Sequence, residues 1–302
     1  MRVARKILLV AGLLVVLVGI AAWLRPVSFF NGYSHLHMCL AGARSRSVTV
    51  DGIHIHYYVA GPKDGQVVVL IHGLAGRAEN WQNLAPYLVN AGYRVYMPDL
   101  PGFGRSERPP AFSYSVRDQA AVVTGFLDAL RLQQVYLGGM SMGGWVVQLV
   151  ASEHPERIRK LVLFDSAGLR AMPAWDTRLF TPNNTEEVRR FLHILMPHPP
   201  ALPEFIWRDV VRVTKRNAWV VQRAMQTMLT GADATDALLP RLKMPVLIVW
   251  GTEDQIIPLS QGETTHRLVP QSKLELAPGC GHLAVMQCAG DIGPGLLKFL
   301  QD

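Results

Sequence analysis

The feature that most constrains the fold is a serine flanked by glycines and set between two apolar segments. Gly139-Met140-Ser141-Met142-Gly143 follows the apolar run 135–137 and begins a segment, 142–152, with apolar residues at helical spacing. A serine at such a junction occupies a sharp, strained turn, and Gly139 and Gly143 are small enough to let strand and helix approach closely. The pattern predicts a strand, a turn that exposes the Ser141 hydroxyl, and a helix.

Strand patterns alternate with helix patterns through most of the remaining chain. Segments rich in apolar residues predict strands at 67–71, 93–97, 135–137, 160–164 and 245–250, and the segment 273–276 completes the predicted sheet. Helical spacing predicts helices at 79–90, 115–132, 142–152 and 284–300, the last with an irregularity at Gly290–Gly295. Val48–Val50 and His54–Val59 predict an antiparallel pair joined at Asp51-Gly52. This alternation is typical of an α/β fold, with a mostly parallel central sheet and helices on both faces.

The strand pattern stops between Gly168 and Lys243. This stretch carries helix signals, including a helix start at Thr185-Glu186-Glu187, and many apolar and aromatic side chains. We therefore expect a helical cap at 169–243, inserted into an α/β core that is formed by 46–168 and 244–302.

The first 25 residues combine positive charges with an apolar segment. Residues 7–24 contain no charged side chain over 18 positions, which as a helix is ~27 Å long and matches the hydrocarbon core of a bilayer. We expect an N-terminal single transmembrane helix, a membrane anchor at 1–25, with the N-terminus cytoplasmic because Arg2, Arg5 and Lys6 precede it. The alternative is a cleaved signal peptide and a secreted chain. The juxtamembrane segment 26–45 then lies along the membrane or packs on the body, and both interpretations stay open.

Most of the net charge of +7 lies in this N-terminal part. Residues 1–50 contain six basic side chains and no Asp or Glu, which leaves +1 for the rest of the chain. A nearly neutral body has no basic stripe for phosphates, so we expect no nucleic-acid partner. Cys39, Cys280 and Cys288 are too few for a disulfide framework. We expect thiols, with a Cys280–Cys288 bridge as the alternative, and no metal site because no CxxC pair is present.

Ser141 needs a base to act as a nucleophile, and chain order points to one histidine. In a strand–turn–helix architecture of this kind, the nucleophile is followed along the chain by a carboxylate and then by the base. His282 lies late in the chain, follows Gly281 and comes after the predicted strand 273–276. The sequence therefore predicts His282 as the base, while a serine that only caps the helix 142–152 is the alternative for Ser141.

The carboxylate that orients this base has three candidates. Asp254 follows the predicted strand 245–250 and is the residue that we favour. Glu253 beside it and Asp165, which follows the strand 160–164, are the alternatives. The predicted catalytic set is Ser141, Asp254 and His282.

Backbone amides near the nucleophile are predicted to form an oxyanion hole. The amide of Met142 follows Ser141 at the start of the helix, and the loop His72-Gly73-Leu74 follows the strand 67–71. We expect the Met142 and Leu74 amides to bind a carbonyl oxygen as it becomes negative. His72 is expected to brace its loop rather than to act in catalysis.

The chain resembles the α/β-hydrolase superfamily over about residues 46–302. The resemblance rests on His72-Gly73, Asp99–Ser106, Gly139–Gly144, Trp250–Gln255 and Gly281-His282. A closer likeness is to membrane-anchored monoacylglycerol lipases, through the apolar N-terminal segment, Ser141-Met142-Gly143-Gly144, Ala167-Gly168-Leu169 and Cys280-Gly281-His282.

The resemblance implies a serine esterase or lipase that hydrolyses carboxylic esters of lipids through an acyl-enzyme on Ser141. It implies a small lipid or ester substrate. From the residues themselves we expect contact with a membrane through the N-terminal helix, and no cofactor or metal, because the Asp residues that follow the strands lack the companions of a metal cluster. Hydrolysis of short esters, hydrolysis of a carbon–carbon bond in ring-fission products, and a non-catalytic binding module are the alternatives. No oligomeric state is predicted.

Overall fold

An eight-stranded sheet forms the centre of the structure, a computed structural model that describes residues 6, 12, 18–171 and 176–302. The strand order is β1-β2-β4-β3-β5-β6-β7-β8. The strands are β1 (Arg44–Val50), β2 (Ile53–Ala60), β3 (Val67–Ile71), β4 (Arg94–Pro98), β5 (Val135–Met140), β6 (Ile158–Phe164), β7 (Val246–Gly251) and β8 (Lys273–Ala277). Strand β2 pairs antiparallel with β1 and β4, and the other neighbouring strands pair in parallel. The predicted mostly parallel sheet is confirmed.

The first two strands form a hairpin at the predicted turn. Asp51 and Gly52 both have positive φ angles, 47° and 81°, as a two-residue turn of type I′ requires. Val50 then pairs with Ile53 in the antiparallel ladder.

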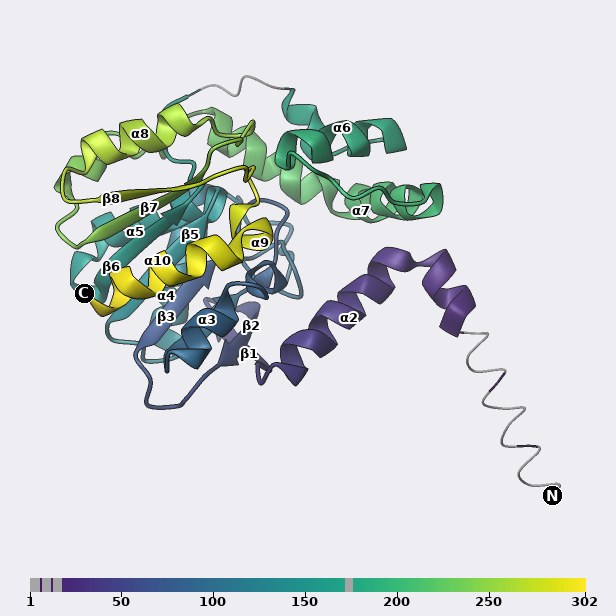
Figure 1. The fold of residues 1–302 in the computed structure, drawn as a ribbon, viewed down its shortest axis with the longest axis horizontal. Helices are drawn as coiled ribbons and strands as arrows, with labels where there is room; N and C mark the ends of the chain where they lie inside the picture. Colours follow the sequence, from purple (N-terminus) through teal and green to yellow (C-terminus); the bar gives the residue numbers. More distant parts are fainter. Residues whose placement is uncertain (1–5, 7–11, 13–17, 172–175) are drawn as a thin grey trace.

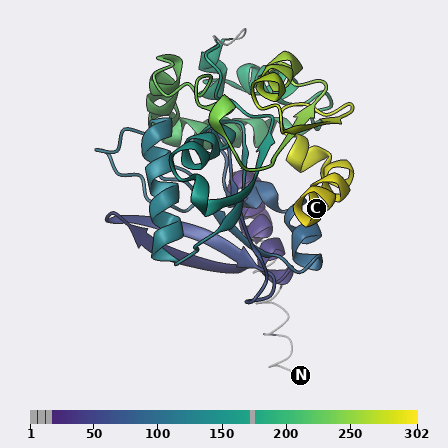
Figure 2. The same cartoon turned by 90° about the vertical axis from the view of Figure 1, so that its left-hand side faces the viewer.

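Helices cover both faces of the sheet, as the sequence predicts. On one face lie α4 (Val116–Ala129), α5 (Met142–Glu153) and α8 (Leu259–Leu268); on the other lie α3 (Ala85–Asn90), α9 (Ala284–Gln287) and α10 (Ala289–Gln301). Alternate side chains of a strand point to opposite faces, so Val69 and Ile71 join one buried cluster, while Val68 and Leu70 join the other. Figure 2 shows the sheet between the teal helices α4 and α5 and the blue and yellow helices α3 and α10.

Two predicted helices are each divided in the structure. The segment 79–90 forms a 3₁₀ turn at Ala78–Trp81 and then α3, because Pro86 in the first turn of α3 fits only near a helix start. The segment 284–300 is divided at Cys288, between α9 and α10, and Pro294 lies inside α10. The irregularity that was predicted at Gly290–Gly295 is therefore wrong in position.

A helical insertion connects β6 to β7. It contains a 3₁₀ turn at Thr177–Phe180, α6 (Thr185–Leu195), α7 (Glu204–Leu229) and a 3₁₀ turn at Leu239–Arg241. Helix α6 begins where the sequence predicts, because the Asn184 side chain accepts a hydrogen bond from the Glu187 amide, 2.9 Å away. The helices α6 and α7 pack on each other through Val188, Trp207 and Val211.

The N-terminal part packs against this insertion. Residues 18–24 are helical, and α2 (Pro26–Leu40) follows. The Val27 amide donates to the Asp209 carboxylate of α7 over 3.0 Å, and Trp23 lies 6.0 Å from Phe205 between ring centroids. Figure 1 shows α2 in purple below α6 and α7 and beside the α/β core.

The predicted membrane anchor, residues 1–25, lies mostly outside the described residues. Within the part of the chain that the structure describes, none of the helices has the length and apolar character needed to cross a bilayer.

Candidate active site

Ser141 occupies the turn between β5 and α5 with a strained backbone. Its φ and ψ are 55° and −123°, a conformation that residues with a side chain rarely adopt. Close packing around the turn holds it there: a Cβ added to Gly139 would lie 2.2 Å from the Gly143 carbonyl oxygen, and one added to Gly143 would lie 2.3 Å from that of Ile71. Only glycine fits at either position, as the sequence predicts.

Three distant loops bring Ser141, His282 and Asp254 together. His282 Nε2 lies 2.8 Å from Ser141 Oγ, and His282 Nδ1 lies 2.8 Å from Asp254 Oδ2. All three side chains are buried. Because Asp254 Oδ2 accepts a hydrogen bond from Nδ1–H, the proton stays on Nδ1 and Nε2 keeps a lone pair that can accept the Ser141 hydroxyl proton.

Asp254 is itself held by its own loop. Its Oδ1 accepts hydrogen bonds from the amides of Ile256 and Ile257, at 2.8 and 2.9 Å, which leaves Oδ2 for His282. This arrangement can fix the orientation and tautomer of the imidazole ring.

The two alternative carboxylates do not contact His282 in the described structure. Glu253 is exposed. Asp165 is fully buried at the end of β6, where its Oδ1 accepts from the Gly251 amide over 2.7 Å. Burial, and then the nearby charge of Asp254, raise the pKa of Asp165 well above its ordinary value. Asp165 therefore favours the neutral acid, unlike a carboxylate that must stabilise an imidazolium ion.

The loop after β3 lies directly against the nucleophile. A Cβ added to Gly73 would lie 3.0 Å from Ser141 Cβ, and Leu74 lines the cavity beside Ser141. Met142 follows Ser141 at the first position of α5. The structure thus places both predicted oxyanion residues next to the nucleophile.

His72 and Asp99 brace this loop. The Leu100 amide donates to His72 Nε2 over 3.0 Å, so His72 Nδ1 carries the proton and donates to the Gly73 carbonyl over 2.8 Å. Burial lowers the pKa of His72, which keeps the ring neutral. Asp99 accepts from the Ala78 amide over 2.7 Å and lies 2.8 Å from His56 Nδ1.

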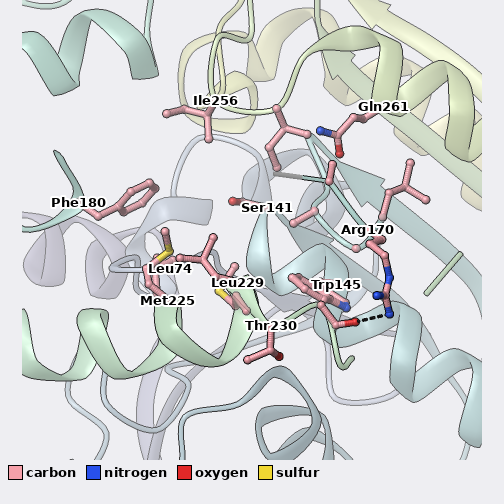
Figure 3. Close-up of a pocket in the computed structure, with 17 residues that line it drawn as sticks. Leu74, Ser141, Trp145, Arg170, Phe180, Met225, Leu229, Thr230, Ile256 and Gln261 are labelled. Carbon is pink, nitrogen blue, oxygen red and sulfur yellow. Dashed lines mark hydrogen bonds between the residues drawn. The ribbon is translucent and has the colours of Figure 1, made fainter. Parts of the chain in front are cut away.

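An apolar cavity of about 350 Å³ opens above Ser141. The α/β core and the helical insertion both line it, with Leu74, Trp145, Ile256 and Ile257 from the core and Leu169, Phe180, Met225, Met228 and Leu229 from the insertion. Figure 3 shows Ser141 between Phe180 on one side and Arg170 and Gln261 on the other. The cavity can hold an aliphatic chain next to the nucleophile.

Sequence reasoning did not identify most of these lining residues. Trp145 is the lining residue that the sequence could have indicated, because it lies one helical turn after Ser141 and so on the same face of α5. Its indole N–H donates to the Asp233 carbonyl over 2.7 Å and so ties α5 to the insertion. Arg170, after β6, and Gln261, in the first turn of α8, reach the cavity only through the tertiary fold.

Cys280 and Cys288 form a disulfide bond, so the prediction of thiols is wrong. The loop after β8 turns back to the start of α10 and brings their Cα atoms to 6.4 Å, a normal separation for a disulfide. Cys280, Cys288 and the Asp291 carboxylate lie close enough together to hold a metal ion, but bonded sulfurs offer no thiolate ligands. Cys39 is a free, exposed thiol.

Comparisons with known proteins agree with the α/β architecture described above. A family model described as the alpha/beta hydrolase fold matches residues 66–288. A 2-hydroxy-6-oxo-6-phenylhexa-2,4-dienoate hydrolase of Burkholderia cepacia is 29% identical over 85% of this chain and 96% of its own. Lipase 1 of Psychrobacter immobilis is 27% identical over 84% of this chain and 83% of its own.

A solved structure extends the likeness to the N-terminal part. The crystal structure of a membrane phospholipase A, described as a bacterial virulence factor, matches with a TM-score of 0.84 and 27% identity. The match covers 98% of each chain, so it includes α2 as well as the α/β core.

Proposed function

The chain belongs to the alpha/beta hydrolase fold family, and we propose that within this family it is a serine hydrolase that cleaves carboxylic esters of lipids. One observation supports the proposal: Ser141, His282 and Asp254 are linked by hydrogen bonds, and Ser141 lines a largely apolar cavity. The nucleophile and base are within hydrogen-bonding reach, and the space beside them suits a hydrocarbon chain.

The reaction follows from the roles of these groups. Ser141 Oγ attacks the ester carbonyl while His282 Nε2 takes its proton, and Asp254 stabilises the imidazolium. The amides of Leu74 and Met142 donate to the oxyanion. Collapse of the tetrahedral intermediate expels the alcohol, which takes the proton from His282. Water then attacks the acyl-enzyme with His282 as base, which releases the acid and restores Ser141.

A monoacylglycerol is the lipid ester that we favour as substrate. The cavity of about 350 Å³ is lined mostly by apolar side chains, which suits one acyl chain. Relatives named as lipases and the membrane phospholipase A structure support an ester substrate. The second candidate is hydrolysis of a carbon–carbon bond in a ring-fission product, because similarly distant relatives are named as hydrolases of such dienoates. The fold alone does not separate these reactions.

The N-terminal part supports attachment to a membrane. In α2, the side chains of Phe29, Tyr33, Leu36 and Leu40 follow helical spacing on one face and are more than half exposed, whereas Ser34 and Met38 on another face are buried. An apolar face that is turned away from the body suits the interfacial region of a bilayer. We propose that 1–25 is an anchor with a cytoplasmic N-terminus, that α2 lies on the membrane, and that 169–243 is a cap over the substrate.

Covalent labelling tests the enzymatic part of this proposal. A fluorophosphonate probe is expected to label the wild-type protein, and Ser141→Ala is expected to abolish labelling with an unchanged melting temperature. Folded wild-type protein that does not react would favour a binding module.

A substrate panel tests the reaction itself. We expect turnover of monoacylglycerols, and weaker turnover of short nitrophenyl esters, which fill less of the apolar cavity. Turnover of a ring-fission dienone with no activity on any glyceride would contradict the lipid-ester assignment and favour the second candidate.

A further inference from the structure

Arg170 carries the only charge among the described residues that line the cavity. It follows β6, at the point where the chain leaves the α/β core for the insertion, and it is exposed. As an exposed residue that also lines the cavity, Arg170 lies where the cavity meets solvent. Figure 3 shows Arg170 and Phe180 on opposite sides of Ser141.

The charge of Arg170 has no carboxylate partner in the described structure. Its guanidinium donates one hydrogen bond, to the Gly231 carbonyl after α7, over 3.1 Å, whereas Asp236 accepts from its backbone amide. Several other arginines of the insertion are ion-paired, among them Arg178 with Asp176, Arg189 with Glu204, and Arg212 with Asp209. Arg190, Arg216, Arg223 and Arg241 have no ion pair among the described residues either, but they do not line the cavity. A guanidinium has five N–H donors, so most of the Arg170 donors remain free for a ligand.

We propose that Arg170 binds an anionic group of the substrate, the phosphate of a single-chain lipid phosphate ester. The proposal rests on the ester hydrolysis proposed above and modifies its substrate: the phosphate of a monoacylglycerol binds in preference to the neutral monoacylglycerol. With the acyl chain among the apolar side chains on the Phe180 side and the ester at Ser141, the polar part of the substrate extends towards Arg170. The planar guanidinium fits two oxygens of a phosphate or a carboxylate.

A structural role for Arg170 predicts a different result from a binding role. A cation beside the last carbonyls of α7 stabilises the helix end, and its loss would then affect every substrate equally. A group that binds substrate charge would instead discriminate between a neutral and an anionic ester with the same acyl chain.

The test compares three soluble esters with one acyl chain: octanoylglycerol, octanoylglycerol phosphate and octanoylglycerate. The full chain is used in neutral detergent, with each substrate below its micelle concentration, so that no charged interface contributes. Arg170→Gln removes the charge and Arg170→Lys keeps it without the planar fork. Arg190→Gln is the matched control, because Arg190 is exposed on α6 and does not line the cavity.

We expect Arg170→Gln to lower kcat/KM for the phosphate ester about tenfold more than for octanoylglycerol, which corresponds to about 1.4 kcal/mol. The loss should appear mainly in KM, and the wild-type preference for the phosphate should weaken as salt is added. Arg170→Lys should lie between the wild type and Arg170→Gln. Arg190→Gln should leave the ratio of the two kcat/KM values unchanged.

Equal losses on the neutral and anionic esters would overturn the proposal and assign Arg170 to the end of α7. A change confined to octanoylglycerate would overturn the phosphate assignment in favour of a carboxylate. If the wild-type protein hydrolyses none of the three esters, the proposed function itself fails, and the Arg170 proposal fails with it.

Discussion

At the scale of single residues, two positions with a positive φ lie at the ends of neighbouring strands, Ser141 after β5 and Asp165 after β6. Ser141 keeps a positive φ because Gly139 and Gly143 let β5 and α5 approach closely. Asp165 also has a positive φ, 44°, and is buried at the end of β6. Strain of this kind persists only where the surrounding structure over-determines it, which is the case at the carboxyl ends of these two central strands.

Asp165 gives a prediction about stability against pH. Because burial and Asp254 raise its pKa in the folded chain, the unfolded chain ionises at this position at a lower pH than the folded chain. Below the unfolded pKa of about 4 both states are protonated, and Asp165 has no effect on the pH dependence. As pH rises from there towards the raised folded pKa, Asp165 ionises in the unfolded state but not in the folded state. This ionisation stabilises the unfolded state, so the free energy of unfolding falls.

We therefore expect Asp165→Asn to be more stable than the wild type near pH 7, with a difference that disappears towards pH 4. Asparagine tolerates positive φ and can still accept from the Gly251 amide. Urea unfolding of both proteins at a series of pH values measures the difference. Asp165→Asn should keep its esterase activity, whereas Asp254→Asn should lose about 10³- to 10⁴-fold in kcat. A gain in stability that is independent of pH would contradict this explanation.

At the scale of elements, the sequence predicts the sheet better than the helices. The central parallel strands were visible as apolar runs, because a strand buried on both faces needs one; β5 and β7 are buried at each position. The edge strand β8 is an exception, because Lys273 and Glu275 alternate with its apolar residues. The sequence indicated the ends of helices less well. The break at Cys288, between α9 and α10, depends on how the chain turns after His282, and this turn is set by the tertiary fold. The Cys280–Cys288 disulfide was only the alternative to free thiols for the same reason, because spacing in sequence does not determine Cα separation.

This disulfide closes the segment that carries the base. Cys280 and Cys288 enclose His282, between β8 and α10. Closing a loop of this length lowers the entropy of the unfolded chain, which in the chain-entropy model stabilises the folded state by about 2–3 kcal/mol. The bond also restricts the movement of the loop that holds His282 near Ser141.

We expect dithiothreitol to lower both the melting temperature and kcat of the wild type, with a smaller effect on KM, because the base loses its fixed position. The double variant Cys280→Ser and Cys288→Ser is the control: it should have the lowered values at the outset and should not respond to dithiothreitol. Unchanged kcat in a reduced protein, verified by counting free thiols, would show that the bond does not position His282.

At the scale of the whole molecule, the sequence predicted the order of the parts but not their contacts. The insertion was visible because strand signals stop after Gly168, and the three catalytic candidates followed from chain order. How α2 packs against α7 was not visible, because an apolar segment such as 26–40 has no pattern that distinguishes a membrane surface from a protein surface. Val27, Asp209, Trp23 and Phe205 supply that contact.

The exposed face of α2 gives a prediction for the molecule on a bilayer. Leu36 lies on this face and is 55% exposed, whereas Ser260 is an exposed residue of α8, on the side of the molecule away from α2 in Figure 1. In a Cys39→Ser background, Leu36→Cys and Ser260→Cys each provide one accessible thiol, because Cys280 and Cys288 are bonded.

An environment-sensitive dye at position 36 is expected to shift to shorter wavelength in nanodiscs and to be quenched by nitroxide-labelled lipids. The physical reason is that the apolar side chains of α2 lose contact with water when they enter the interfacial region. The same dye at position 260 should show neither effect, because α8 faces water when α2 lies on the membrane. Equal quenching at both positions, or none at position 36, would contradict membrane contact through α2 and leave the apolar face of this helix to another partner.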